Sequence, residues 1–383
     1  MPARAAHRSG LVLLTWTIAV AALAALGVAV THYLGGSSGS SNGVSGMAAM
    51  HGTAHALSRA GGDPAGPLLG AALFTKWQLN ALALAVLVLA AAWYLTAAAL
   101  VAVRDPGTRW PLRHTLTFMA GLLVCGYATN GAIAVYDQVL FTAHMAGHLA
   151  LVMLAPALLV AGHPFDLALA ASTPRRRERL ARIMRGRVIS LLLTPPIALA
   201  SYTVVIVGSH LTGLMNTIMR NSWIGEVEHL VYVIVGIQFF VLVVGDHPIR
   251  WRLSSPVRWL LLAVGMAVDT FTGIVLMQGS DAVAMIHSAQ VNVDPLSDTR
   301  TGGAIMWFGG DALMAIVMVA LVIGWLRRVE TDQADEKGWL EQARRATFSA
   351  HTGDESTAAD TFDDDDAARA SYNAWLADLE RRG

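Results

Sequence analysis

The chain has 383 residues, of which 55% are hydrophobic and only 14% carry a charge. An average soluble protein carries a charge on about 25% of its residues, so this composition excludes an ordinary soluble enzyme and indicates a membrane protein. The net charge is zero, which argues against a nucleic-acid-binding protein. The single cysteine, Cys125, excludes an internal disulfide and a metal site made of cysteines alone.

Eight apolar stretches are long enough to cross a bilayer as helices, which takes about 20 residues each. The stretches are continuous in Leu, Ala and Val, whereas the strands of a membrane barrel alternate over about ten residues. We therefore predict an all-α polytopic membrane bundle with eight transmembrane helices, a seven-helix core preceded by one N-terminal span. The predicted spans are 11–30, 78–103, 115–135, 139–161, 188–210, 223–244, 257–277 and 303–326.

These spans divide the chain into four predicted parts. Residues 1–30 form an N-terminal transmembrane helix or signal anchor, because their apolar core is long for a signal sequence; a cleaved signal sequence is the alternative. Residues 31–76, rich in Gly and Ser, form a flexible outer loop that contains Met and His. Residues 77–328 form the seven-helix membrane domain. Residues 329–383 form an acidic and mostly disordered cytoplasmic tail.

The positive charges predict the orientation of the spans, because cytoplasmic loops of membrane proteins are enriched in Lys and Arg. Alternate loops are rich and poor in these residues, and the basic stretch before the first span belongs to the rich set. The poor set contains only Arg59, Lys76, Arg220 and Arg300. We therefore predict a multi-pass protein of the plasma membrane with both termini in the cytoplasm.

Four ionisable residues on three predicted helices fall in one layer of the outer half of the membrane. At about 1.5 Å per residue, His144, His148, His229 and Asp269 lie roughly 7 to 13 Å from the outer boundary. Ionisable residues inside a bilayer are costly and usually functional. A lone histidine there more often forms a hydrogen bond between helices, but this layer contains a pair at metal-binding spacing.

His144 and His148 belong to the motif H-M-A-G-H. Their i, i+4 spacing places both imidazoles on one helix face, where two nitrogens can bind one metal ion. We predict a metal site formed by His144, His148 and His229, with Met145 as an auxiliary thioether ligand. Two carboxylates, those of Asp269 and Glu228, are predicted to hold the imidazoles in one tautomer.

The metal that this ligand set favours is copper, as Cu(I), because imidazole and thioether dominate over carboxylate. The lack of an oxygen-rich cage disfavours calcium and magnesium, whereas three histidines leave zinc as an alternative. Further Met and His residues lie in the outer loop and near the outer ends of the spans. We predict a copper access route that uses Met47, Met50, His51, His55, His210 and His287.

Several motifs occur in the chain in a fixed order. The segment F-T-A-H-M-A-G-H-L-A-L is followed by A-P-A-L-L-V-A-G-H-P, then by Glu228-His229, and then by D-T-R-T-G-G-A-I-M-W-F-G-G-D from Asp298 to Asp311. Over roughly residues 75–328 this set resembles the multispanning CtaG-type cytochrome c oxidase assembly factors. The histidine positions of that family correspond to His144, His148 and His229.

The resemblance implies a bacterial membrane protein that is not an enzyme and that delivers or inserts copper into a haem–copper oxidase at the outer side of the membrane. Its implied partners are cytochrome c oxidase subunits, an extracytoplasmic copper donor and the lipid bilayer. Three alternatives remain open: a haem-binding protein with axial histidines, a copper-uptake protein, and a structural partner of the oxidase that binds no metal.

Overall fold

A computed structural model of the chain describes residues 68–104, 109–244, 247–251, 253–283, 291–327 and 329, with a few helical residues between 370 and 381. The predicted first span and the outer Met/His loop lie outside the described residues. The contacts divide the chain into two units, Met1–Met318 and Val319–Gly383. In the second unit the structure describes the end of the last membrane helix and exposed helical residues such as Arg381, which pairs with Asp378 at 3.9 Å.

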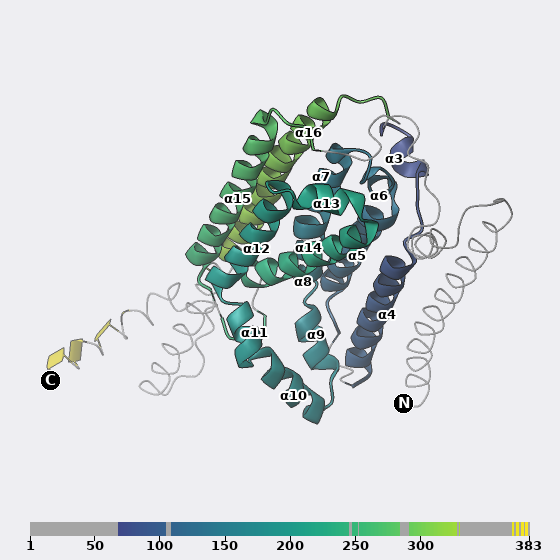
Figure 1. Cartoon of the computed structure of the whole chain (residues 1–383). Coiled ribbons are helices and arrows are strands. Elements are labelled where there is room, and N and C mark those ends of the chain that lie inside the picture. The colour runs from purple at the N-terminus through teal and green to yellow at the C-terminus, as the bar shows by residue number, and fades with distance from the viewer. Residues whose placement is uncertain are drawn as a thin grey trace. The chain divides into compact units, whose positions relative to one another are not determined.

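The first unit is helical, as the composition predicts (Figure 1). In the bilayer every backbone polar group must find an internal partner, and a helix provides these partners within one segment. The elements are α3 (Ala72–Thr75), α4 (Ala81–Arg104), α5 (Leu112–Asn130), α6 (Ala132–Tyr136), α7 (Phe141–Leu149), the π-helical η2 (Ala150–Leu154), α8 (Ala155–Ala161), α9 (Pro164–Ala171), α10 (Pro174–Met184), α11 (Arg187–Leu192), α12 (Pro195–His210), α13 (Leu214–Arg220), α14 (Ser222–Val243), α15 (Ser255–Gln278), α16 (Pro295–Ala304) and the π-helical η4 (Ile305–Gly309).

Six helices in the described part of the chain are long and apolar enough to cross a membrane, and they match six of the eight predicted spans. They are Ala81–Arg104, Leu112–Tyr136, Phe141–Ala171, Trp223–Val243, Ser255–Gln278 and Pro295–Arg327. The predicted span 188–210 is instead divided between α11 and α12. Pro195 at the start of α12 lacks a backbone N–H and ends the preceding helix, which leaves α12 with 16 residues.

The helix formed by α7, η2 and α8 lies at the centre of the bundle. Its α7 part contacts α16, its η2 and α8 parts contact α14, and α8 also contacts α5. Around it, α12 contacts α14 and α15, and α15 contacts α16. The H-M-A-G-H motif is therefore carried by the helix that most of the other helices surround.

Small residues bring helices α15 and α16 into backbone contact, as is common between membrane helices. A Cβ atom added to Gly273 of α15 would lie 2.8 Å from the carbonyl oxygen of Gly303 in α16. We expect Gly273→Ala to destabilise the fold by about 1–3 kcal/mol, the usual cost of overpacking. Thermal unfolding in detergent measures this change.

Gly208 of α12 provides the matched control, because a Cβ added there would meet no atom of the described residues within 4 Å. Alanine is favoured over glycine inside a helix by about 0.5–1 kcal/mol, so Gly208→Ala should leave stability unchanged or raise it. Equal effects of the two substitutions would show that the close contact at Gly273 is unimportant.

Candidate metal-binding site

His144 and His148 lie on one face of α7, and both side chains are buried with only 1% of their surface exposed. The carboxylate of Asp298, in the first turn of α16, accepts hydrogen bonds from the backbone N–H groups of Phe141 and Thr142, at 2.6 and 3.1 Å. It thereby satisfies two of the four N–H groups that the start of α7 leaves without helical partners. The position of the histidine pair is thus fixed by a contact from a distant part of the sequence.

Asp137 connects two of the predicted ligands. Its Oδ1 lies 3.0 Å from Nδ1 of His144, and its Oδ2 lies 3.8 Å from Nε2 of His229 in α14. A carboxylate on Nδ1 fixes the tautomer of a histidine and leaves Nε2 for a metal, an arrangement common around metal sites. Asp137 therefore orients the imidazole of His144. This is the role that the sequence predicted for Asp269 and Glu228.

His148 meets two aromatic rings from other helices. The ring of His210, at the end of α12, lies 4.7 Å from that of His148 between centroids, and the ring of Tyr232 in α14 lies 4.6 Å away. His210 also lies 6.0 Å from the ring of His144. The structure thus brings His210, predicted as part of an access route, into direct contact with the motif on α7. We call His144, His148, His210 and His229 the α7 histidine cluster.

Several nitrogens of this cluster have no hydrogen-bond partner among the described residues. They are Nε2 of His144, both ring nitrogens of His148, Nε2 of His210 and Nδ1 of His229. Burying a polar group without a partner is costly, so a buried polar atom of this kind requires an explanation such as an ordered water or a bound ion. Neutral imidazole is the most common protein ligand of transition metals.

The remaining predicted residues are the auxiliary ligand Met145, the supporting carboxylates Glu228 and Asp269, and the access route. Met145 is fully buried and points toward α16, because a Cβ on Gly302 would lie 3.0 Å from its Cγ. Glu228 accepts a hydrogen bond from the hydroxyl of Tyr232 and so contacts the cluster through that ring. Asp269 accepts a hydrogen bond of 2.7 Å from the hydroxyl of Tyr202. Of the predicted access route, Met47, Met50, His51, His55 and His287 lie outside the described residues.

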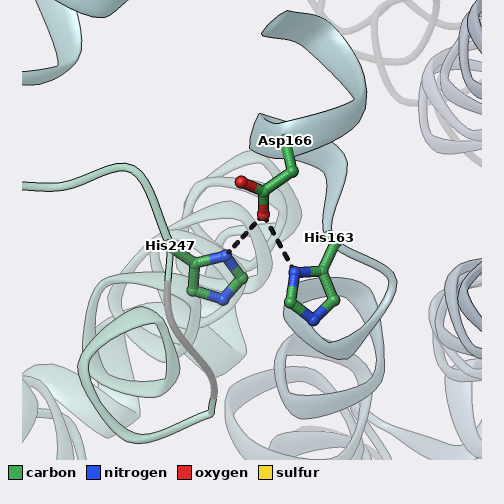
Figure 2. A group of neighbouring side chains, drawn as sticks. All are labelled: His163, Asp166 and His247. Carbon is green, nitrogen blue, oxygen red and sulfur yellow. Dashed lines mark hydrogen bonds and ion pairs between the residues drawn. The ribbon is translucent and has the colours of Figure 1, made fainter. Parts of the chain in front are cut away.

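A second group of possible ligands lies near the other end of the same long helix (Figure 2). His163, Asp166 and His247 are the one set of three His, Cys, Asp or Glu residues in the described part of the chain whose ligand atoms all lie within 4.8 Å of one another. This group could hold a metal ion. We call it the His163 group.

The sequence reasoning missed Asp137, Tyr232 and the His163 group. Asp137 lies between two predicted spans, where a carboxylate is usually taken to be solvated. The segment H-P-F-D contains His163 and Asp166 at i, i+3 spacing, and His247 is also followed by proline. These signals were visible, but only the fold shows that the two segments meet.

These helices and buried histidines define a polytopic helical membrane protein with groups suited to metal binding. The sequence model of one family, described as cytochrome c oxidase caa3 assembly factor (Caa3_CtaG), matches residues 92–328. The match covers more than half of the chain, which therefore belongs to this family. Membership confirms the predicted resemblance.

The chain is also similar to three uncharacterised mycobacterial proteins, from Mycobacterium leprae, Mycobacterium bovis and Mycobacterium tuberculosis. The first is 30% identical over 323 residues, and the other two are 30% identical over 322 residues. These alignments cover 80–81% of this chain and 45% of each relative, so the chain spans about half the length of the curated relatives it matches. No solved structure matches the chain.

Proposed function

We propose that the α7 histidine cluster binds Cu(I) as cargo and releases it to a cytochrome c oxidase subunit during assembly. The observation that supports this most directly is the set of buried imidazole nitrogens on α7, α12 and α14 that have no partner in the described part of the chain. Family membership supports an oxidase subunit as the recipient, because the family is described as one of cytochrome c oxidase assembly factors.

The proposed ligands are Nε2 of His144, a ring nitrogen of His148 and Nε2 of His210, with His229 as a further donor. Two or three imidazole nitrogens suit Cu(I) and are compatible with zinc. Asp137 orients His144, and the ring of Tyr232 confines His148. We assign no ligand role to Met145, because its side chain packs toward Gly302.

The transfer that we propose is ligand exchange, in which bonds from copper to imidazole nitrogens are replaced by bonds to ligands of the recipient. No covalent bond of the protein changes, and the oxidation state of copper stays the same. The alternation of arginine-rich and arginine-poor loops supports a topology in which the cluster lies toward the outer side of a bacterial plasma membrane and both termini lie in the cytoplasm. In this topology an extracytoplasmic donor would supply the copper. The recipient would be a copper centre of the oxidase on the same side.

The test is to delete the gene and to measure oxidase activity and the copper content of the purified oxidase at limiting copper. We expect both to fall severalfold and to recover when the wild-type gene is restored. Excess copper should partly bypass the deletion. Normal activity and normal copper content in the deletion strain would contradict a role in assembly.

Purified protein separates copper from the haem alternative. Wild-type protein in detergent, titrated anaerobically with Cu(I) against a chromogenic chelator, should bind about one equivalent at the α7 histidine cluster. A Soret absorption band at full occupancy would instead identify a haem protein and overturn the proposal.

A further inference from the structure

We propose that the His163 group is a second metal site, separate from the α7 histidine cluster, which binds a divalent transition-metal ion of the zinc class. His144 and His163 are 19 residues apart along the helix of α7, η2 and α8, which corresponds to roughly 28 Å at 1.5 Å per residue. The two groups therefore cannot share an ion. This inference does not depend on the proposed role in copper delivery.

Two segments far apart in the sequence supply the group. His163 follows the end of α8, Asp166 lies in the first turn of α9, and His247 lies between α14 and α15. His247 precedes the start of α15 by eight residues in the sequence and reaches Asp166 across the fold. A bound ion would therefore connect the α8–α9 junction to the loop between two membrane-spanning helices.

The distances within the group are close to those of a tetrahedral metal site. Oδ2 of Asp166 lies 2.9 Å from Nδ1 of His163 and 3.5 Å from Nδ1 of His247. Zinc bonds of about 2.0–2.1 Å place neighbouring ligand atoms about 3.3–3.4 Å apart in a tetrahedron. Figure 2 shows both imidazoles turning a nitrogen toward the same carboxylate oxygen, so a small rearrangement would admit an ion among the three atoms.

His247 provides the observation that points to a ligand. Only 2% of its surface is exposed, and its Nε2 has no hydrogen-bond partner within the described ranges. Its ring is packed between His163, at 5.0 Å, and Phe165, at 5.9 Å between centroids. A structural histidine buried this completely normally has hydrogen bonds on its nitrogens, whereas a metal ligand needs a free lone pair.

The backbone at His163 holds its imidazole in place. This residue has a φ of +53°, a left-handed conformation that non-glycine residues seldom adopt, and Pro164 follows as the first residue of α9. Residues in such conformations often occur at functional sites. Here the left-handed residue ends one helix and brings its ring within 2.9 Å of the first-turn carboxylate of the next.

His114 adds a third imidazole next to the group. Its ring lies 4.4 Å from that of His163 between centroids, and its Nδ1 lies 3.1 Å from the carbonyl oxygen of Ala161. With its Nδ1–H donated to this carbonyl, Nε2 of His114 keeps a free lone pair. His114 can thus complete a four-coordinate ion after a rotation of its ring, or a water molecule can take the fourth position.

The ligand chemistry favours a divalent ion. Two imidazoles and a carboxylate suit Zn²⁺ and Co²⁺. The proposed ligands of the α7 histidine cluster are imidazole nitrogens without a carboxylate, so the two groups of this chain differ in their ligand sets. We expect the α7 histidine cluster to take Cu(I) and the His163 group to take Zn²⁺ or its spectroscopic substitute Co²⁺.

The experiment uses the full chain in detergent, stripped of metal with a chelator and titrated with Co²⁺, whose visible absorption reports the geometry of its ligands. We expect one equivalent of tetrahedral Co²⁺, displaced by Zn²⁺, in the wild-type protein. Asp166→Asn and His247→Gln should each weaken binding at least tenfold, whereas Asp166→Glu should keep a measurable part of it.

His148→Ala is the matched control, because it removes an imidazole from the α7 histidine cluster and leaves the His163 group intact. This variant should bind Co²⁺ as the wild type does, even if Cu(I) binding is lost. Circular dichroism of each metal-free variant checks that it is folded. Equal Co²⁺ binding by the wild type and folded Asp166→Asn, or loss of Co²⁺ in His148→Ala alone, would overturn the second site. Absence of Cu(I) binding in the wild type would contradict only the proposed function.

Discussion

Replacing His148 by alanine is expected to reduce the affinity for Cu(I) by more than 100-fold and to abolish the copper-dependent activity of the protein in oxidase assembly. His148 shares one face of α7 with His144, its ring lies 4.7 Å from that of His210 on α12, and neither of its ring nitrogens has a hydrogen-bond partner in the part of the chain that the structure describes. Its removal would therefore take one of the proposed donors out of the site.

Asp137→Asn gives a graded comparison with the ligand substitution. The carboxylate of Asp137 lies 3.0 Å from Nδ1 of His144 and would act on a metal only through that ring. Loss of such an orienting group typically reduces metal affinity by roughly 10- to 100-fold. We therefore expect Asp137→Asn to bind Cu(I) more weakly than the wild type but more tightly than His148→Ala.

Met145→Leu is the control that separates metal binding from packing in α7. Leu and Met have similar volumes, and such exchanges usually cost less than about 1.5 kcal/mol. Because Met145 packs toward Gly302, we expect the variant to retain wild-type Cu(I) affinity in the same chelator competition. A loss as large as that of His148→Ala would restore the thioether as a ligand, and wild-type affinity in His148→Ala would remove the α7 histidine cluster as the copper site.

The sequence was sufficient to predict the helical class and the six described spans, because long apolar runs in lipid have few structural options. It did not show the break in the predicted span 188–210, where Pro195 and Pro196 divide the apolar stretch between α11 and α12. Hydropathy averages over a window and does not detect a missing backbone donor. The missing backbone N–H of proline, and not the hydropathy of the stretch, therefore decides where α12 begins.

The candidate site was predictable where it depends on one helix and unpredictable where it depends on contacts between helices. The i, i+4 spacing of His144 and His148 follows from helix geometry alone. The contact between His148 and His210 depends on how α12 meets α7 and α14, which sequence spacing does not report. The same reason explains the His163 group, in which His163 and His247 are 84 positions apart and share one carboxylate oxygen.

Asp298→Ala is expected to destabilise the fold by about 2–4 kcal/mol, because it leaves buried N–H groups at the start of α7 without acceptors. The carboxylate of Asp298 also accepts a hydrogen bond from the hydroxyl of Thr142, and its negative charge lies at the positive end of the α7 dipole. Since α7 carries His144 and His148, the substitution should also weaken Cu(I) binding. Thermal unfolding and chelator competition measure the two effects on the same sample.

Asp294→Ala supplies the control for this effect, because Asp294 caps α16 itself by accepting a hydrogen bond of 2.8 Å from the backbone N–H of Ser297. Asp294 is exposed, so water can replace the lost acceptor, and the cost should stay near the 0.5–2 kcal/mol typical of an N-cap. Copper affinity should not change, because α7 keeps its acceptor. Asp294→Ala and Asp298→Ala could instead prove equally destabilising and bind copper equally well. The carboxylate of Asp298 would then be an ordinary helix cap, and the idea that α16 positions the histidine pair would be wrong.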